Sequence, residues 1–494
     1  MPAAIRFLFD GKICEVPRPD SGMTLLQFLR ERMRKTGTKE GCAEGDCGAC
    51  TVLVGEARAG KVHWRSVNAC ILPVAMLDGR ALMTVECLSD GEKLHPVQQA
   101  MVDQNASQCG FCTPGFAMSI VARTMGAAGT DIEPKDAIAG NLCRCTGYGP
   151  ILAVMNLKAC LVANGDRKQN AEGQGDGAIL QALSDIGRKN GLALKWRDPV
   201  TQTQRQWFLP RSIDELMKLM ARFPKARLVA GATDVGVEIA KFDNTPETAI
   251  FLGELRALQL IEETDSELRI GACVRLVDAL GPLSRLSNEL GELILRFGAV
   301  QIRNSATVVG NIANGSPVGD LLPALIMLGA NLEIRSEDSV RYVPIETYFI
   351  GYRKQDLVAG EFIQSVIIPR ISRNAHCRIT KLTKRHDCDI SAVCGAIALE
   401  IENDKIVDAR IAFGGMAETP IRARKTEAKL VGAAWSRESV FAAADELINE
   451  LTPISDARAS SAYRSDMAAN LVRDMWPATM TSRFPLKTAK PVSV

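Results

Sequence analysis

Apolar and polar residues alternate at the start of the chain as they do in β-strands. Residues 5–9 (IRFLF) and 12–16 (KICEV) flank the dipeptide Asp10-Gly11, which favours a tight hairpin turn. Thr24 and Gln27 then form a capping box, so we expect a helix to begin there. This pattern predicts a small domain of strands with a helix after the first hairpin.

Helical periodicity replaces this alternation further along the chain. We expect helices over residues 116–125, 134–141 and 151–160. Residues 164–177 are polar and rich in glycine, without apolar periodicity, which predicts a flexible linker. We expect the whole linker to extend to residue 195.

After the linker, strands and helices alternate. Residues 207–209 and 226–230 read as strands, and Ser212 to Ala221 as an amphipathic helix between them. This alternation is typical of an α/β domain. A last helix is expected over residues 463–475. The predicted division is 1–90, 91–163, the linker 164–195, 196–372 and 373–494.

Composition narrows the possible functions. A chain of 494 residues corresponds to about three domains. The 59 Lys and Arg residues nearly balance the 57 Asp and Glu residues, so we expect no nucleic-acid partner and no membrane surface. Because we find no signal core and no apolar run of about 18 residues, we expect a cytoplasmic protein. Disulfides are uncommon in that compartment, so clustered cysteines favour metal binding or catalysis.

Four cysteines form a first set near the start of the chain: Cys42, Cys47, Cys50 and Cys70. The first three are spaced Cys-x4-Cys-x2-Cys, and a distant fourth completes the spacing of plant-type [2Fe–2S] ferredoxins. Glycines at positions 41, 45 and 48 allow the backbone to fold closely around a cluster. Zinc is the competing interpretation, but zinc ligands usually come as Cys-x2-Cys pairs. The spacing therefore favours iron.

A second set follows: Cys109, Cys112, Cys143 and Cys145. Its Cys-x2-Cys and Cys-x-Cys spacings are compatible with either iron or zinc. The other seven cysteines have no ligand spacing, and we expect most of them to be small buried apolar side chains. They are Cys14, Cys87, Cys160, Cys273, Cys377, Cys388 and Cys394.

Two loops of small residues lie in the predicted α/β domain. Residues 231–238 (GATDVGVE) follow a predicted strand and open a predicted helix, where backbone amides could bind a pyrophosphate. The segment is not a GxGxxG fingerprint, so close packing of strand and helix explains its small residues equally well. Residues 301–320 supply further amides and hydroxyls, which strengthens the case for an anion site. The charges at 384–389 indicate by themselves a solvated turn.

The two cysteine sets, in this order, resemble the paired [2Fe–2S] domains of the molybdenum hydroxylase family. QCGFCTPG (108–115) and NLCRCTGY (141–148) match motifs that are close to diagnostic for its second domain. The resemblance implies an α+β multidomain protein in which both sets bind [2Fe–2S] clusters and Gln108 lies at the edge facing a molybdenum pterin. The implied domains are a ferredoxin-like β-grasp domain, a helical-bundle domain, an α/β FAD-binding domain and a C-terminal α+β flavoprotein domain.

Later segments resemble the FAD domain of the xanthine dehydrogenases in that family: residues 228–240 (LVAGATDVGVEIA), 306–324 (ATVVGNIANGSPVGDLLPA) and 349–354 (FIGYRK). The resemblance implies a pyrophosphate site at Val229, Ala230, Gly231, Ala232, Thr233, Asp234 and Val235. It implies that the phosphate, ribose and flavin contact Thr307, Gly310, Asn311 and Asp320.

The same resemblance reverses the interpretation of the charged run. It assigns Lys381, Asp389 and Ile390 to the flavin site, where nicotinamide docks. A lysine near the flavin N1–C2=O edge stabilises negative charge on the reduced ring, so Lys381 is the candidate catalytic residue. No other residue of the chain is assigned to catalysis, and we expect His386 on the surface.

The resemblance covers nearly the whole chain but only the iron–sulfur and FAD parts of the family. It implies a large molybdenum-cofactor subunit as partner, in a dimer of heterodimers. We expect electrons to pass from that partner through both clusters to FAD and on to NAD+, in oxidation of hypoxanthine and xanthine to urate. Two alternatives stay open: the equivalent subunit of an aldehyde or other N-heterocycle dehydrogenase, and a zinc-stabilised scaffold with a nucleotide-binding regulatory module.

Overall fold

The computed structural model describes residues 4–17, 19–20, 22–127, 132–157, 176–199, 201–372 and 374–476. The chain divides into two compact units. The first comprises residues 1–260, 272–278 and 298–310, and the second comprises 261–271, 279–297 and 311–494. No helix in the described part of the chain is long and apolar enough to cross a membrane.

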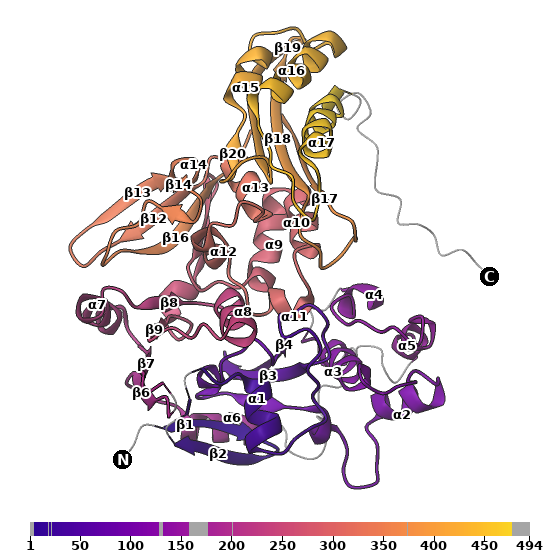
Figure 1. Ribbon diagram of the computed structural model, residues 1–494, viewed down its shortest axis with the longest axis vertical. Helices are drawn as coiled ribbons and strands as arrows, with labels where there is room; N and C mark the ends of the chain where they lie inside the picture. Colours follow the sequence, from indigo (N-terminus) through magenta and orange to yellow (C-terminus); the bar gives the residue numbers. More distant parts are fainter. Residues whose placement is uncertain are drawn as a thin grey trace. The chain divides into compact units, whose positions relative to one another are not determined.

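A five-stranded sheet of order β2-β1-β5-β3-β4 begins the first unit (Figure 1). β1 and β2 form the predicted hairpin, and β1 also pairs in parallel with β5. The predicted capping box is confirmed, because Thr24 caps the helix and Gln27 bonds back to its backbone. The elements are β1 (Ala4–Phe9), β2 (Lys12–Pro17), α1 (Leu25–Gln27) with a π-turn at Phe28–Arg32, β3 (Thr51–Arg58), β4 (Lys61–Asn68), β5 (Ala81–Met83), and 3-10 turns at Val74–Leu77 and Val85–Leu88.

Four helices follow as a small bundle: α2 (Pro96–Asp103), α3 (Thr113–Thr124), α4 (Pro134–Ala137) and α5 (Gly149–Met155). Their apolar faces share one core, in which Phe116, Ile120 and Ile151 are completely buried. The helix predicted over 134–141 ends earlier, because residues 138–141 turn to pack against the first cysteine loop. The end of the helix predicted over 151–160 lies outside the described residues.

The predicted linker is wrong in its second half. Residues 176–186 form helix α6 (Asp176–Ile186), and the next strand already starts at Leu192. Ile179, Leu183 and Ile186 recur at helical spacing and are buried against the first sheet. The glycine-rich segment ends at residue 177, and the apolar residues that follow it at helical spacing belong to α6 and not to a linker. The first half of the predicted linker, up to residue 175, lies outside the described residues.

A second sheet of the first unit has the order β6-β7-β9-β8. β9 pairs in parallel with both β7 and β8, as expected for an α/β arrangement. Ser212 caps the predicted amphipathic helix, α7. The elements are β6 (Leu192–Arg197), β7 (Gln204–Leu209), α7 (Ile213–Arg222), β8 (Arg227–Val229), α8 (Thr233–Phe242), β9 (Thr248–Phe251), a 3-10 turn at Arg256–Gln259, and α11 (Val300–Arg303).

The second unit contains an antiparallel sheet of order β10-β11-β16-β12-β13 and the hairpin β14-β15. Helices α9 (Leu276–Leu286) and α12 (Val308–Asn314) contain residues of both units. The other elements here are β10 (Ile261–Glu263), β11 (Glu267–Gly271), α10 (Asn288–Leu295), α13 (Leu321–Met327), β12 (Asn331–Arg335), β13 (Val340–Pro344), α14 (Ile345–Tyr348), β14 (Phe349–Gly351), β15 (Lys354–Gln355) and β16 (Phe362–Pro369).

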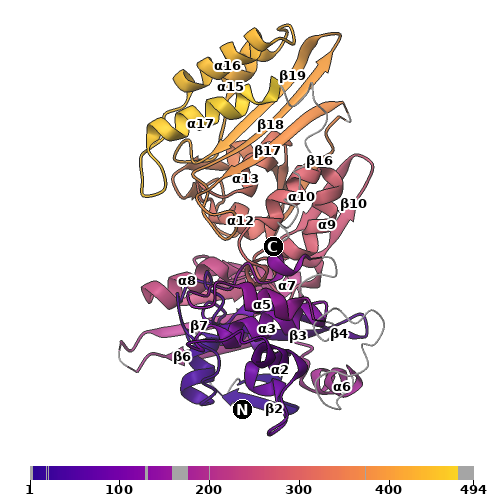
Figure 2. The ribbon, with the colours of Figure 1, turned by 90° about the vertical axis from the view of Figure 1, so that its right-hand side faces the viewer.

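A four-stranded sheet of order β17-β18-β19-β20 completes the second unit. Figure 2 shows α15, α16 and α17 lying along one face of this sheet, where their apolar residues form a shared core. The predicted last helix is confirmed as α17. The elements are β17 (Ala375–Leu382), β18 (Val393–Glu402), β19 (Lys405–Gly414), β20 (Ile421–Arg422), α15 (Arg424–Leu430), α16 (Arg437–Glu450) and α17 (Ser461–Arg473).

Candidate functional site

The first four predicted ligands come together at one end of the β1–β5 sheet. Cys42, Cys47 and Cys50 lie on the loop before β3, and Cys70 lies just after β4. The Sγ atoms of Cys50 and Cys70 are 3.3 Å apart. The Cys42 thiol makes side-chain hydrogen bonds with those of Cys47 and Cys70. The four sulfurs therefore form one connected group.

Backbone amides surround the sulfur of Cys42. The N–H groups of Glu44, Asp46 and Cys47 donate to it over 3.5, 3.3 and 3.4 Å. The pKa of Cys42 is lowered, mainly by hydrogen bonds with the Cys47 and Cys70 thiols and further by backbone donors. The same contacts raise the pKa of Cys47 and of Cys70, so the environment favours a thiolate at Cys42, and a thiolate is the form that ligates iron.

The second set forms two contacts, each between sulfurs from different loops. Cys109 is hydrogen-bonded to Cys145, and Cys112 to Cys143. The first loop ends where α3 begins, and the second lies between α4 and α5. Each pair joins one cysteine from each loop, so a cluster bound here would tie the two loops together.

Thr146 stabilises the thiolate form of Cys143. Its N–H donates to the Cys143 sulfur over 3.5 Å, and its hydroxyl lies 3.1 Å from the same atom. Burial works to raise the pKa of Cys143, but these hydrogen bonds outweigh it and lower the pKa. Burial raises the pKa of Cys112 to about 12. Cys109 and Cys145 are exposed.

The sulfur contacts fit the iron–sulfur clusters that the resemblance implies. A [2Fe–2S] cluster spreads four thiolates over two irons. The first set forms one connected group of four sulfurs beside backbone donors, and the second set forms two sulfur pairs, so each set brings together cysteines from separate segments.

The two cysteine loops are in direct contact. The N–H of Leu142 donates to the carbonyl oxygen of Cys47 over 3.0 Å. The Asn141 side chain donates to the carbonyl of Gly48 over 3.1 Å. A Cβ atom on Gly48 would lie 2.3 Å from the Gly140 carbonyl oxygen, so only glycine fits this approach. Both loops therefore lie side by side, joined by one main-chain hydrogen bond and one hydrogen bond from a side chain to the main chain.

The predicted pyrophosphate residues of the first unit form a tight strand-to-helix turn. Val229 ends β8, and α8 begins at Thr233. Ala232 has φ +60°, which is unusual for a residue with a side chain. A Cβ atom on Gly231 would lie 2.0 Å from the Ser305 carbonyl oxygen. The loop at residues 231–238 and the loop that begins at residue 301 thus approach each other as closely as their backbones allow.

The remaining predicted residues of this unit belong to the second loop. The Thr307 hydroxyl accepts from the N–H of Gly310 over 2.9 Å and so caps the start of α12. The first unit contains the predicted residues 229–235, Thr307 and Gly310, and the second unit contains Asn311, Asp320, Lys381, Asp389 and Ile390.

In the second unit, Lys381 and Asp320 form a buried ion pair with an Nζ–Oδ2 distance of 2.6 Å. Lys381 is only 4% exposed and also donates to the Arg296 carbonyl over 3.1 Å. The hydroxyl of Ser391 donates to the other carboxylate oxygen of Asp320. Sequence reasoning predicted both charged residues but missed their pairing, and it missed Ser391, whose only signal was its position beside Ile390.

The side chain of Asn311 has a hydrogen-bond acceptor that is available to bind a ligand. Its Oδ1 atom is buried and has no hydrogen-bond partner among the described residues. Buried polar atoms are normally satisfied, so such an atom calls for an explanation. An orphaned acceptor at a predicted cofactor position fits a donor from a bound FAD.

Asp389 and Ile390 lie on the loop between β17 and β18. The Asp389 carboxylate accepts from the N–H groups of Arg385 and Ile390 over 2.9 and 3.0 Å. Burial tends to raise the pKa of Asp389, but these donors outweigh it and lower the pKa. Arg296, another residue that sequence reasoning missed, donates to the carbonyls of Lys381 near the end of β17 and of His386 within the loop, and so ties the first half of this loop to β17.

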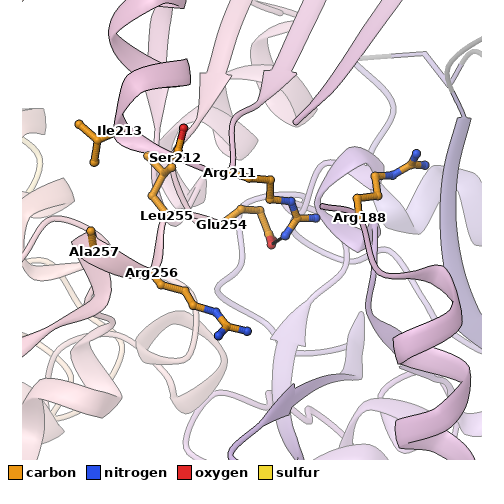
Figure 3. A pocket seen from close by; sticks show the side chains of 8 residues that line it. All are labelled: Arg188, Arg211, Ser212, Ile213, Glu254, Leu255, Arg256 and Ala257. Carbon is orange, nitrogen blue, oxygen red and sulfur yellow. Dashed lines mark hydrogen bonds and ion pairs between the residues drawn. The ribbon is translucent and has the colours of Figure 1, made fainter. Parts of the chain in front are cut away.

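A cavity of about 290 Å³ lies elsewhere in the first unit (Figure 3). Arg188, Arg211 and Glu254 line it, but Arg188 already bonds to Asp78, and Arg211 bonds to Glu254. None of the predicted cofactor residues lines this cavity. It is therefore separate from the candidate sites.

The other cysteines only partly follow the prediction. Cys273 and Cys394 are buried, whereas Cys14, Cys87, Cys377 and Cys388 are partly exposed. Cys160 lies outside the described residues. None of these six described cysteines belongs to the sulfur group of the first set or to the sulfur pairs of the second set.

Four family matches cover the chain in order. Residues 7–75 match the 2Fe-2S iron-sulfur cluster binding domain, and residues 84–156 match the [2Fe-2S] binding domain. Residues 201–371 match the FAD binding domain in molybdopterin dehydrogenase. Residues 378–479 match the CO dehydrogenase flavoprotein C-terminal domain.

Similar curated proteins include two xanthine dehydrogenases. The protein from Drosophila subobscura is 33% identical over 94% of this chain, and that from Oryza sativa subsp. japonica is 33% identical over 84%. The chain spans only 38% and 35% of their lengths. Among solved structures, a carbon monoxide dehydrogenase from Hydrogenophaga pseudoflava is 26% identical with a TM-score of 0.52. The match covers 54% of this chain and 94% of that one.

Proposed function

The chain belongs to the molybdenum hydroxylase family, of which it contains the iron–sulfur and flavin domains, and we propose that it relays electrons from a molybdenum-cofactor partner to NAD+. When bound, [2Fe–2S] clusters exchange single electrons, and FAD combines two of them for transfer as hydride. The roles of the chain's own residues are to hold these groups close together and to tune their charge.

The observation that carries the proposal is the contact between the two cysteine loops. Cys47 is a predicted ligand of the first cluster, and its carbonyl accepts a hydrogen bond from Leu142, the neighbour of the predicted ligand Cys143. One hydrogen bond and a few covalent bonds therefore separate ligands of the two clusters. Such closeness suits a relay and has no purpose in two independent zinc sites.

The surroundings of the second set support a partner that binds there. Cys109 and Cys145 are exposed, and the adjacent Phe111 and Leu142 are 47% and 40% exposed. Exposed apolar side chains around a redox group suit docking of another protein surface. We infer that this surface, with Gln108 at its edge, faces the molybdenum cofactor, and that the complex is a dimer of heterodimers.

On the flavin side, we propose that residues 229–235, Thr307 and Gly310 bind the phosphates and ribose of FAD. Asn311, Asp320, Lys381, Asp389 and Ile390 would contact the flavin and the docking nicotinamide. The Lys381 ammonium is fixed by Asp320, so it would act as an oriented donor with most of its charge balanced. The orphaned Asn311 Oδ1 supports the presence of a bound donor.

We propose xanthine and hypoxanthine as substrates of the partner, with urate as the product. The support is that the relatives at 33% identity are named xanthine dehydrogenases. Co-purification with a larger molybdenum-containing chain, followed by assay with xanthine and NAD+, tests this choice. Turnover of an aldehyde or of another N-heterocycle, without turnover of xanthine, would show that the partner's substrate is not a purine of this kind.

Metal, sulfide and flavin analysis of the purified chain tests the electron-transfer role. We expect about four irons, about four labile sulfides and one flavin per chain. Zinc without labile sulfide would overturn the role. Stopped-flow mixing with NADH tests the acceptor separately: NADH should bleach the flavin, and bleaching by dithionite alone would argue against a nicotinamide site.

A further inference from the structure

Gln301 lies outside both iron–sulfur domains in sequence yet is buried between them in the first unit. It belongs to α11 within the matched FAD-binding domain, and it is 1% exposed. Its side-chain Nε2 donates to the hydroxyls of Thr51 and Ser119 over 3.1 and 3.2 Å. The same nitrogen lies 3.3 Å from Oδ1 of Asn141.

These three partners belong to the elements that carry the cluster ligands. Thr51 directly follows Cys50 and starts β3. Ser119 lies in α3, which begins directly after Cys112. Asn141 lies two residues before Cys143. The amide nitrogen of Gln301 therefore contacts the ferredoxin-like domain through Thr51. It contacts the helical domain through Ser119, on the helix that follows Cys112, and through Asn141, close to Cys143.

The orientation of the Gln301 amide follows from its partners. Asn141 donates its own nitrogen to Gly48 and accepts from Ser119 over 2.7 Å, so its Oδ1 is an acceptor. Thr51 donates to Gly48 over 2.6 Å, so its oxygen also accepts. Only the nitrogen end of Gln301 can face these acceptors. Its Oε1 is left buried without a hydrogen-bond partner among the described residues.

Loss of the Gln301 side chain should affect the relative placement of the two iron–sulfur domains more than the stability of the fold. Thr51, Ser119 and Asn141 each keep another hydrogen bond when Gln301 is removed. The buried, unpaired Oε1 costs free energy in the native protein. Replacement of Gln301 by an apolar side chain of similar length should therefore leave folding nearly intact while removing this link, so that the two domains stay joined by contacts such as those between residues 47–48 and 140–142.

We propose that Gln301 is a positioning residue that sets the distance and orientation between the two iron–sulfur clusters. The inference rests on the proposed electron-transfer function. Because Gln301 belongs to the flavin-binding part of the sequence, the alignment of the clusters depends on that part being in place. The matched control is Asn304, which is equally buried and, among the described residues, donates only to the Ser66 carbonyl and hydroxyl of β4, at 2.9 and 3.2 Å.

The test compares Gln301→Met and Asn304→Leu in the holoprotein. The first readout is the spin–spin interaction between the two reduced clusters in electron paramagnetic resonance spectra, which depends on their distance and relative orientation. The second is the rate at which an electron injected by pulse radiolysis equilibrates between the clusters. Iron, sulfide and flavin contents are measured in parallel, so absence of clusters in the wild-type protein would count against the proposed function and not against this role of Gln301.

Gln301→Met should keep full cluster content but change the spin–spin interaction. Because electron transfer slows as the distance between two redox groups grows, we expect equilibration between the clusters to slow several-fold. Asn304→Leu should leave both readouts unchanged. Ser119→Ala, which removes one acceptor, should change both in the same direction by less and serves if Gln301→Met does not fold. The proposal would be overturned if Gln301→Met showed the spin–spin interaction and the equilibration rate of the wild type. If Gln301→Met does not fold, the same result in Ser119→Ala would overturn it.

Discussion

The N–H of Leu142 donates a hydrogen bond of 3.0 Å to the carbonyl oxygen of Cys47, so the two cysteine loops meet through their main chains. The contact is tight because glycine occupies position 48, where any Cβ atom would meet the Gly140 carbonyl. The loops that carry the two predicted clusters are thus in direct contact. Each cluster has its own four cysteines, so we expect each to form independently of the other.

Cys109→Ser should therefore remove the second cluster and leave the first. The exposed Cys109 contributes one of the two sulfur contacts of its set, to Cys145. We expect iron to fall from about four to about two per chain, with loss of one of two paramagnetic signals. Cys14→Ser on β2 is the matched control and should keep both clusters. Retention of all the iron in Cys109→Ser would remove Cys109 from the ligand set.

Gly231→Ala should weaken FAD binding without affecting the clusters. The added Cβ would lie 2.0 Å from the Ser305 carbonyl, which forces the two glycine-rich loops apart. Flavin content and FAD affinity, measured by fluorescence quenching, should both fall, while iron content stays constant. Gly177→Ala is the control, because nothing lies within 4 Å of its Cβ position. Normal flavin content in Gly231→Ala would mean that these loops do not hold the cofactor.

Lys381→Met should destabilise the protein strongly. It leaves the Asp320 carboxylate buried, with the Ser391 hydroxyl as its only side-chain donor in the part of the chain that the structure describes. Loss of one partner of a buried ion pair costs about 3 kcal/mol or more in unfolding free energy. Urea unfolding measures this loss. Lys384→Met, at an exposed lysine whose ammonium donates to the Ala457 carbonyl, should change stability by less than about 0.5 kcal/mol. Equal effects of the two substitutions would contradict the ion pair.

Glu289 should make the stability of the protein depend on pH. Burial raises its pKa from 4.5 to about 7, opposed in part by the N–H of Ile379 and by Arg378. A raised folded-state pKa stabilises the protonated form, so this contribution is complete below pH 4.5 and is lost as pH rises through 7.

Glu289→Gln stays neutral and can still accept from Ile379. It should be more stable than the wild type by about 3 kcal/mol at pH 8 and equal to it at pH 4. Thermal or urea unfolding at the two pH values measures the difference. A variant that is no more stable than the wild type at pH 8 would show that Glu289 is ionised without penalty.

Local sequence patterns predicted local structure well. The first hairpin, the Thr24 capping box and helix α17 were all predicted, because each depends on residues close in sequence. Helix α6 was missed because its apolar stripe follows a glycine-rich segment directly. Helix α4 ends early because Asn141 is used in a contact with Gly48, which no local pattern indicates.

The site was predicted as a set of residues and not as an arrangement. Cysteine spacing identified both sets of four, but the pairing of Cys109 with Cys145 depends on the packing of two separate loops. The Lys381–Asp320 ion pair joins residues from different elements of the second unit. Gln301, in helix α11, was not predicted as a site residue because a single glutamine in a segment of small polar residues carries no signal until its burial is known.

The most direct test of the account is an anaerobic reductive titration of the purified chain followed by electron paramagnetic resonance. The account predicts two distinct [2Fe–2S] signals, each integrating to about one spin per chain, with a mutual interaction when both clusters are reduced. A single signal, or two signals that never interact, would contradict a paired relay. Absence of any signal from a protein that contains zinc would contradict the iron–sulfur assignment itself.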